Sequence, residues 1–262
     1  MTSYKVELEV ATQIAFKAGK IMRRYFKDGQ QRMIKVDGTP LTIADTTINR
    51  MVIEELREHF PDDIVVGEEE STGGYGTGRR WLCDPIDGTK AFTWGVPTAM
   101  FSLALVIDGR PTVGVAYEPQ LEMLYSAVMG EGAFCNAQPL RVNSDSLQSG
   151  ILATLSSPSR IRNDAAYLRE FIDSKVDMAV FSGAVAKSVR VAEGRFVGYL
   201  EEMVNPYDMA AVDVIVTEAG GMLTSFDGKQ LDYINGFTGA VVTNGVIHDE
   251  LLQVINRSRQ ST

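Results

Sequence analysis

Residues 81–92 read WLCDPIDGTKAF. An apolar run ends here in two aspartates, Asp84 and Asp87, which stand three apart around Pro85. A surface turn would explain the pattern. A site for cations and phosphate would explain it too, because both carboxylates could reach a shared pair of metal ions, with the Ile86 carbonyl turned inward by Pro85. Gly88 would then let the backbone approach a phosphate closely.

The composition is that of a folded, acidic protein. Of the 262 residues, 45% are hydrophobic and 23% are charged, which is enough to bury a substantial core. Lys and Arg number 25 against 34 Asp and Glu, so the formal charge is −9. Such a protein lacks the electrostatic footprint of nucleic-acid binding, and we expect no nucleic-acid partner. To handle phosphate it would need local cations, and metal ions are the obvious source.

The sequence gives no sign of a membrane or of secretion. It has no run of 18 apolar residues, and its start, MTSYKVELEV, does not read as a signal peptide. The two cysteines, Cys83 and Cys135, suit reduced thiols better than a disulfide framework. We therefore expect a cytoplasmic protein.

Hydrophobic periodicity predicts a layered α/β fold. Helices are expected over 5–27 and from Thr42 or Asp45 to Pro61, followed by a short strand at 64–66. Antiparallel strands at 101–107, 112–118 and 123–128 follow, the first two joined by a turn at 108–111. From residue 150 strands alternate with helices, with strands at 151–155, 178–181, 196–200, 222–225 and 240–243 and helices at 164–173, 184–193, 207–219 and 248–256.

This order predicts one domain over 1–262. Its first half, about 1–145, would hold a mixed sheet, and its second half, about 146–262, would alternate strands and helices. Residues 29–42 are polar and are expected to form a loop. Residues 29–40 could form a mobile flap over the site, and within them Lys35 fits the flap or a solvated loop charge equally well.

The sequence has no complete motif of a phosphatase that forms a covalent phosphoenzyme. Cys135 and Arg141 fit C-x5-R, but that phosphate loop needs consecutive backbone N–H groups, and Pro139 lacks one. The stretch 86–89 is similar to the DxDGT of aspartyl-phosphate enzymes, but Pro85 stands where their nucleophilic aspartate belongs. The only histidines, His59 and His248, have no Ser or Cys partner in a recognisable motif.

Carboxylates recur at the ends of predicted elements. Glu68–Glu70 follow a strand, Asp84 and Asp87 follow another, and Asp45 and Asp208 open helices. Each alone could be a helix cap or a solvated turn. Together they fit a hard cation such as Mg²⁺, which prefers oxygen ligands.

These residues resemble the inositol monophosphatase superfamily of metal-dependent phosphatases. The matching motifs are GEE at 67–69, DPIDGT at 84–89, and Asp208 followed by EAGG at 218–221. Further likeness is found in ADTTINR at 44–50 and GEGAFCNAQPLRV at 130–142. The likeness therefore covers nearly the whole chain.

The resemblance implies a five-layered αβαβα sandwich, a site with two or three Mg²⁺ ions, inhibition by lithium and a homodimer. By motif position the metal ligands would be Glu69, Asp84, the Ile86 carbonyl, Asp87 and Asp208. The catalytic residues would be Asp45, Thr89 and Glu69, of which Asp45 and Thr89 orient and deprotonate the attacking water. The amides of Gly88 and Thr89 would hold phosphate oxygens. Water on a metal has a lowered pKa, so no phosphoenzyme is required.

The substrate is open among several small phosphates. Glu201, seven residues before Asp208, falls where family members contact substrate hydroxyls, and with Glu202 it could pair with the ammonium of histidinol. Lys90 resembles both the histidinol-phosphate and the nucleoside-bisphosphate phosphatases of the superfamily. The stretch 241–252 resembles the histidinol-phosphate branch, whereas 121–128 departs from it, and Tyr207 replaces the usual Trp. Histidinol phosphate is thus slightly favoured over inositol 1-phosphate.

Two alternatives remain. One is a sugar-bisphosphate or nucleoside-3′,5′-bisphosphate phosphatase. The other is a non-catalytic regulatory protein of the same fold, although every acidic ligand position is filled, which argues against lost activity.

Overall fold

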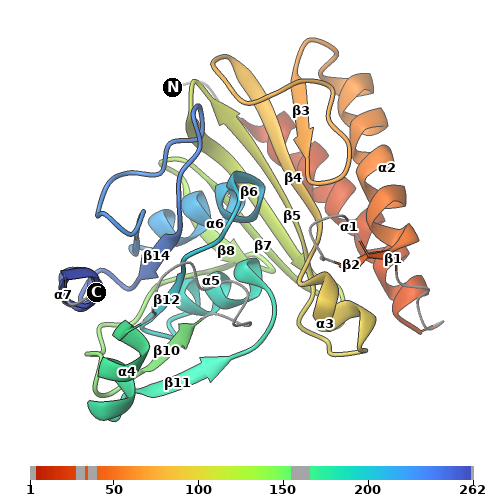
Figure 1. Ribbon diagram of the computed structural model, residues 1–262. Helices are drawn as coiled ribbons and strands as arrows, with labels where there is room; N and C mark the ends of the chain where they lie inside the picture. Colours follow the sequence, from red (N-terminus) through yellow and green to blue (C-terminus); the bar gives the residue numbers. More distant parts are fainter. Residues whose placement is uncertain (1–3, 28–32, 35–39, 155–165, 261–262) are drawn as a thin grey trace.

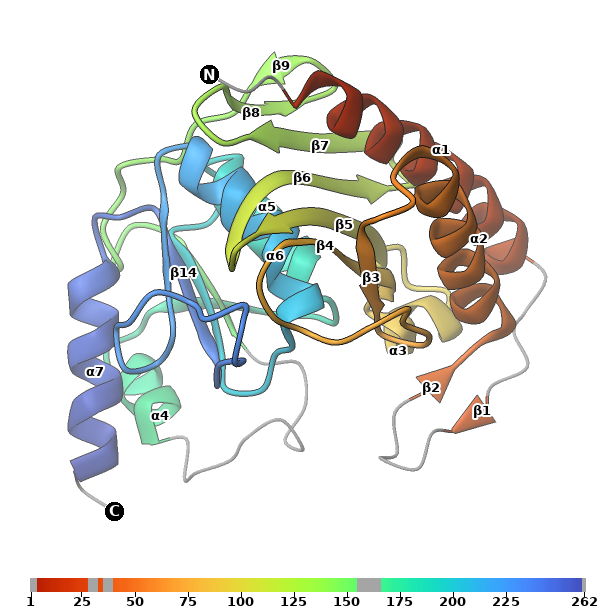
Figure 2. The ribbon, with the colours of Figure 1, turned by 90° about the horizontal axis from the view of Figure 1, so that it is seen from above.

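The computed structural model describes residues 4–27, 33–34, 40–154 and 166–260. From right to left in Figure 1, the chain forms a layer of helices, a large sheet, a second layer of helices, a smaller sheet and a third layer of helices. The predicted five-layered αβαβα sandwich is therefore confirmed. Figure 2 shows the same layers from above.

The first helical layer consists of α1 (Lys5–Lys27) and α2 (Ile43–His59). Their apolar side chains recur every three or four residues, as in Ile14 and Ala18 of α1, and these side chains pack on the large sheet. Two short strands, β1 (Met33–Ile34) and β2 (Pro40–Leu41), come between these helices in the chain and pair antiparallel with each other. Of the predicted flap at 29–40, the structure describes only residues 33–34 and 40, and the rest, with Lys35, lies outside the described residues.

The large sheet has the order β3-β4-β5-β6-β7-β8-β9. Its strands are β3 (Ile64–Gly67), β4 (Arg79–Asp87), β5 (Met100–Ile107), β6 (Arg110–Glu118), β7 (Met123–Val128), β8 (Gly132–Cys135) and β9 (Gln138–Pro139). Only β3 and β4 pair in parallel. The predicted turn between β5 and β6 is confirmed, and Asp108 and Gly109 take the positive φ values that a two-residue hairpin needs.

The smaller sheet has the order β11-β10-β12-β14-β13. Its strands are β10 (Ile151–Thr154), β11 (Asp177–Val180), β12 (Gly198–Glu201), β13 (Met222–Thr224) and β14 (Ala240–Thr243). On its outer face lie α4 (Ala166–Asp173) and α7 (His248–Gln260), which pack through Phe171 and Leu251 among others. The predicted alternation of strands and helices is thus confirmed.

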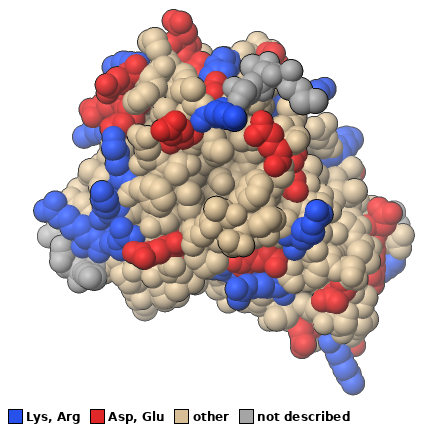
Figure 3. Space-filling model, turned by 180° about the vertical axis from the view of Figure 1, so that it is seen from behind, with Lys and Arg blue, Asp and Glu red and all other residues tan. Residues whose placement is uncertain are grey.

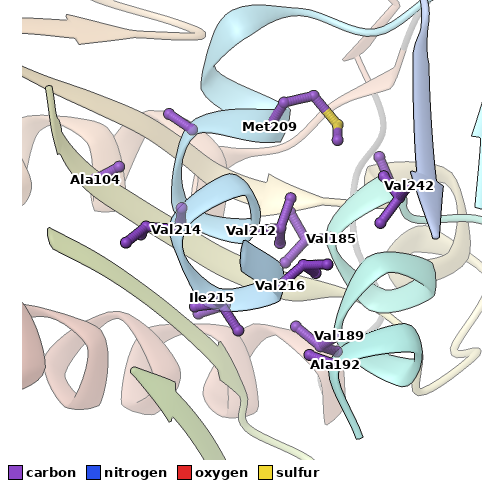
Figure 4. Close-up of a cluster of buried hydrophobic side chains, with 14 of the residues drawn as sticks. Ala104, Val185, Val189, Ala192, Met209, Val212, Val214, Ile215, Val216 and Val242 are labelled. Atoms are coloured by element: carbon purple, nitrogen blue, oxygen red, sulfur yellow. The ribbon is translucent and has the colours of Figure 1, made fainter. Parts of the chain in front are cut away.

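The central layer consists of α5 (Ala184–Ala192) and α6 (Pro206–Glu218). Figure 4 shows Val185 and Val189 of α5 beside Val212 and Val216 of α6. Helix α6 also lies directly on β6, where a Cβ on Gly114 would come within 2.5 Å of the Ala211 carbonyl oxygen. The hydrophobic core around α5 and α6 includes buried side chains from both halves of the chain.

The surface carries charges of both signs. On the face seen in Figure 3, acidic and basic side chains are interspersed around a central area with few charges. Among the described residues, no helix has the length and apolar character needed to cross a membrane.

Candidate active site

The two aspartates of the opening stretch lie inside β4, not after it, and an irregularity of the sheet brings them together. Asp84 pairs with Ser102 of β5 and Asp87 pairs with Met100, so β4 has one residue more than its partner over this interval. Residues three apart on a regular strand point to opposite faces. The bulge around Pro85 removes this alternation, because an extra residue re-aims the side chains that follow it.

Three buried carboxylates meet at this point. One carboxylate oxygen each from Asp84, Asp87 and Asp208 lies within 4.8 Å of the other two. Burial raises the pKa of Asp84 well above its usual value, and the charges of Glu68, Asp208 and Asp87 raise it further. Burial raises the pKa of Asp87 to about 6, against hydrogen bonds that lower it. The carboxylates repel one another in a site screened from water, so a cation would relieve a real cost.

The amino-terminal ends of both central helices point into the cluster. Asp208 is the third residue of α6, and its Oδ2 accepts a hydrogen bond from the Asn205 amide at 2.7 Å, so Asn205 and not Asp208 is the cap. Asp87 accepts hydrogen bonds from α5. The Ala184 amide donates to Oδ1 at 2.9 Å, and the amides of Val185 and Ala186 donate to Oδ2 at 2.9 Å and 3.4 Å.

Two glycines make this contact between α5 and β4 possible. Gly88 has φ +80°, and a Cβ there would lie 3.3 Å from the Cα of Gly183. Gly183 has φ +110°, and a Cβ there would lie 3.0 Å from Oδ2 of Asp87. Side chains at either position would therefore separate the DGT turn from α5.

Asp45 and Thr89 form a second group beside the carboxylates. The Thr89 hydroxyl lies 2.9 Å from the Ile86 carbonyl oxygen and 3.4 Å from Oδ1 of Asp45. Asp45 is the third residue of α2, and its other oxygen accepts the Thr42 amide at 2.9 Å. Burial raises the pKa of Asp45 to about 7. The group thus combines a hydroxyl, which can orient a water, with a carboxyl that can take up a proton near neutral pH.

Of the three consecutive glutamates, Glu68 has the strongest link to the cluster. Its charge is the largest charge effect on the pKa of Asp84, and it also affects Asp45 and Tyr207. The Glu69 amide donates to Asn49 at 3.3 Å, and its charge acts on Asp45 more weakly than that of Glu68. The carboxylates of Asp84, Asp87 and Asp208 therefore come together as predicted, but Glu69 is not part of their 4.8 Å group.

Two tyrosines lie beside Asp208. Tyr207, noted in the sequence as the replacement of the usual Trp, precedes it in α6. Tyr75, which no sequence motif points to, comes from the connection between β3 and β4. Burial and then the charge of Asp208 raise the pKa of both phenols, that of Tyr75 to about 12. Both hydroxyls therefore keep their protons at neutral pH and can donate hydrogen bonds.

Glu201 lies in the interior. Its Oε2 accepts hydrogen bonds from Lys187 at 2.8 Å and from the Tyr199 hydroxyl at 2.6 Å. Glu202 is also buried, and its Oε1 accepts the Tyr167 hydroxyl at 3.0 Å. Contact of Glu201 with substrate stays a prediction, and the structure places an internal ion pair in competition with it. The exposed Lys90 follows Thr89 in α3 (Thr89–Thr93).

The cysteine alternative has no support. Cys135 ends β8, and Asn136 and Ala137 have positive φ in a hairpin turn to β9, so their amides do not form a phosphate loop. Burial raises the pKa of the Cys135 thiol, which keeps it protonated.

Comparisons with known proteins agree with this geometry. Residues 4–260 match the inositol monophosphatase family. A histidinol-phosphatase of Mycobacterium tuberculosis is 38% identical over 95% of this chain and 98% of its own length. An inositol-1-monophosphatase of Synechocystis is 34% identical over 97% and 90%. The solved structure of an IMPase from Thermotoga maritima has a TM-score of 0.87 and 30% identity, covering 97% of this chain and 98% of that one.

Proposed function

The chain belongs to the inositol monophosphatase family and is a phosphatase of this family, and from this premise we propose that it hydrolyses a small alcohol monophosphate with Mg²⁺. The main support for this proposal is the group of three buried carboxylates, Asp84, Asp87 and Asp208, whose oxygens lie within 4.8 Å of one another.

The residues fit a hard divalent cation. Their donors are carboxylate oxygens, which Mg²⁺ prefers. Burial raises the pKa values of Asp84 and Asp87, and neighbouring carboxylates raise that of Asp84 further. We propose that Asp84, Asp87 and Asp208 hold the ions with the Ile86 carbonyl, and that Glu68 rather than Glu69 is the fourth carboxylate. When bound, such ions lower the pKa of water and stabilise the leaving oxygen.

Asp45 and Thr89 are proposed to handle the proton of the attacking water. The Thr89 hydroxyl faces both Oδ1 of Asp45 and the Ile86 carbonyl, so it can orient a water while Asp45 takes up the proton. A carboxyl whose pKa is about 7 suits this task at neutral pH, where it is partly ionised and still basic. The amides of Gly88 and Thr89, at the start of α3, are proposed to hold the phosphate oxygens.

The test is phosphate release from a generic phosphomonoester with and without Mg²⁺. Chelation is expected to abolish turnover, and added Mg²⁺ is expected to restore it, with lithium inhibiting. Calorimetric titration of the metal-free protein with Mg²⁺ checks binding separately from turnover. Full activity in excess chelator would refute the metal mechanism, and Mg²⁺ binding without turnover on any substrate would support the regulatory alternative.

For the substrate we propose histidinol phosphate first and inositol 1-phosphate second. The histidinol-phosphatase relative supports the first, and the inositol-1-monophosphatase relative supports the second. The case from charge is weaker than the sequence suggested, because the carboxylates of Glu201 and Glu202 already accept hydrogen bonds inside the protein. The remaining candidates are a sugar bisphosphate and a nucleoside 3′,5′-bisphosphate.

The deciding measurement is kcat/KM for histidinol phosphate, inositol 1-phosphate, fructose 1,6-bisphosphate and adenosine 3′,5′-bisphosphate at saturating Mg²⁺. A preference for the nucleotide greater than about tenfold, or roughly 1.4 kcal/mol, would overturn the proposal of a small alcohol.

A further inference from the structure

Lys187 of α5 is a charged residue with no solvent exposure and no part in the proposed chemistry. Its Nζ donates to Oε2 of Glu201 at 2.8 Å and to the Thr154 carbonyl oxygen at 3.1 Å. It also lies 4.4 Å from the centre of the Tyr199 ring. Glu201 is the last residue of β12 and Thr154 is the last of β10, so Lys187 joins α5 to the ends of two strands of the smaller sheet.

The same helical turn holds a ligand of the proposed metal site. The amides of Ala184, Val185 and Ala186 donate to the carboxylate of Asp87, which belongs to the large sheet. Lys187 comes directly after them, and its amide bonds the Gly183 carbonyl at 3.4 Å. One turn of α5 therefore connects the smaller sheet, through Lys187, with Asp87 of the large sheet.

Stability alone does not explain this pair. Removing two charges from water is costly, and replacing a buried ion pair by apolar residues is often neutral or stabilising. The remaining surface of α5 offers apolar packing, as Val185 and Val189 show in Figure 4. The pair instead fixes the position of α5. The two hydrogen bonds from the Lys187 ammonium set the rotation of the helix about its axis and its distance from the smaller sheet.

We propose that the Lys187–Glu201 pair is a positioning unit that sets the affinity of the site for its metal ion by holding the first turn of α5 against Asp87. The inference rests on the proposed function, because it takes Asp87 as a metal ligand. It also assigns Glu201 to the support of Asp87 in this chain.

The decisive variant is the double substitution Lys187→Met with Glu201→Gln. It leaves the net charge of the pair at zero, as it is in the wild type. Calorimetric titration of the metal-free variant with Mg²⁺ is expected to give a Kd raised about tenfold or more, the usual range for removing a partner that orients a ligand. At saturating Mg²⁺ the KM for the phosphomonoester is expected to stay within about threefold of the wild type.

The chain offers a matched control at the other end of α5. Arg190 bonds Glu118 and Glu193 in a second, largely buried ion-pair cluster. The double substitution Arg190→Met with Glu118→Gln also removes a neutral pair from α5, but from its last turn instead of the first turn that bonds Asp87. It is expected to cost stability but to leave the Kd for Mg²⁺ within about twofold.

Two results would overturn the inference. The two double variants could bind Mg²⁺ equally well. The single variant Glu201→Gln, which keeps size and shape should the double variant not fold, could bind Mg²⁺ normally. If that variant also raised KM at saturating Mg²⁺, Glu201 would be identified as a substrate contact. If the wild type itself bound no Mg²⁺, the proposed function would fail instead.

Discussion

At the scale of single residues, the glutamates after β3 show how close neighbours take different tasks. The charge of Glu68 raises the pKa of Asp84, whereas the backbone amide of Glu69 donates a hydrogen bond of 3.3 Å to Oδ1 of Asn49. The Asn49 side chain also donates to the Glu70 carbonyl at 2.8 Å. The turn is therefore held against α2 in one register, and this register decides which carboxylate faces the cluster.

We accordingly expect Glu68→Gln to weaken Mg²⁺ binding about tenfold or more, because it removes a negative charge beside Asp84. Glu69→Gln is the matched control, one position along the same turn, and is expected to change the Kd by less than about threefold. Calorimetric titration of both metal-free variants with Mg²⁺ makes the comparison. The reverse order of effects would return the ligand role to Glu69.

Asp45 leads to a prediction about pH. It works as a base only when ionised, so turnover at saturating Mg²⁺ is expected to fall as the pH is lowered through its pKa. That midpoint is expected at or below about 7, because bound cations lower the pKa of a nearby carboxyl. Asp45→Asn is expected to reduce kcat by about 10²-fold or more. A pH profile of kcat for both proteins is the measurement, and an unchanged acid limb in Asp45→Asn would assign the limb to another group.

At the scale of elements, the sequence predicted most helices and strands because their periodicity is strong and their ends carry turn residues. The missed features depend on partners distant in the chain. The bulge of β4 exists only through pairing with β5, and the strand therefore continues to Asp87 instead of ending before Asp84. In the sequence, nothing distinguishes Lys187 from the other polar residues of its helix. Its partners, Thr154 and Glu201, lie on two strands of the smaller sheet.

The meeting of α5 with β4 leads to a prediction for Gly183. A Cβ there would lie 3.0 Å from Oδ2 of Asp87 and 3.2 Å from the Thr98 carbonyl oxygen. Gly183→Ala is therefore expected to push α5 away, with a Kd for Mg²⁺ raised about tenfold or more. Gly130→Ala is the control, since φ is +81° there and nothing lies within 4 Å of the new Cβ.

Both variants place alanine at positive φ and are expected to lose stability, of the order of 1 kcal/mol. Only Gly183→Ala is expected to lose metal affinity as well. Thermal unfolding gives the first quantity and calorimetry the second. Equal Mg²⁺ affinity in the two variants would mean that the close approach of Gly183 has no bearing on the metal site.

At the scale of the whole molecule, three acidic motifs far apart in the chain were enough to predict one site. They lie on β3, β4 and α6, and the layered order of the fold is what brings these elements together. The sequence could not predict how deeply the site is buried, because burial depends on the packing of α5 and α6 between the two sheets. That burial has a consequence for the stability of the metal-free protein.

Four carboxyls, three of them buried and one half-buried, have pKa values above their usual range, mainly because of burial. They are Asp84, well above it, Asp45 at about 7, and Asp87 and Asp213 at about 6. Between the unfolded pKa near 4 and these folded values, the folded chain binds more protons than the unfolded chain. Folding stability in chelator is therefore expected to fall as the pH rises through this window.

We expect the melting temperature in chelator to be at least about 2 °C higher at pH 5.5 than at pH 7.5. At pH 7.5, Mg²⁺ is expected to restore the loss, because the cation binds the ionised carboxylates of the folded state only. Asp84→Asn removes one of the buried acids and is expected to flatten the pH dependence in chelator. Differential scanning calorimetry at both pH values, with and without Mg²⁺, measures all four states. A melting temperature in chelator that rises towards pH 7.5 would show that these carboxyls are ionised and compensated within the metal-free protein.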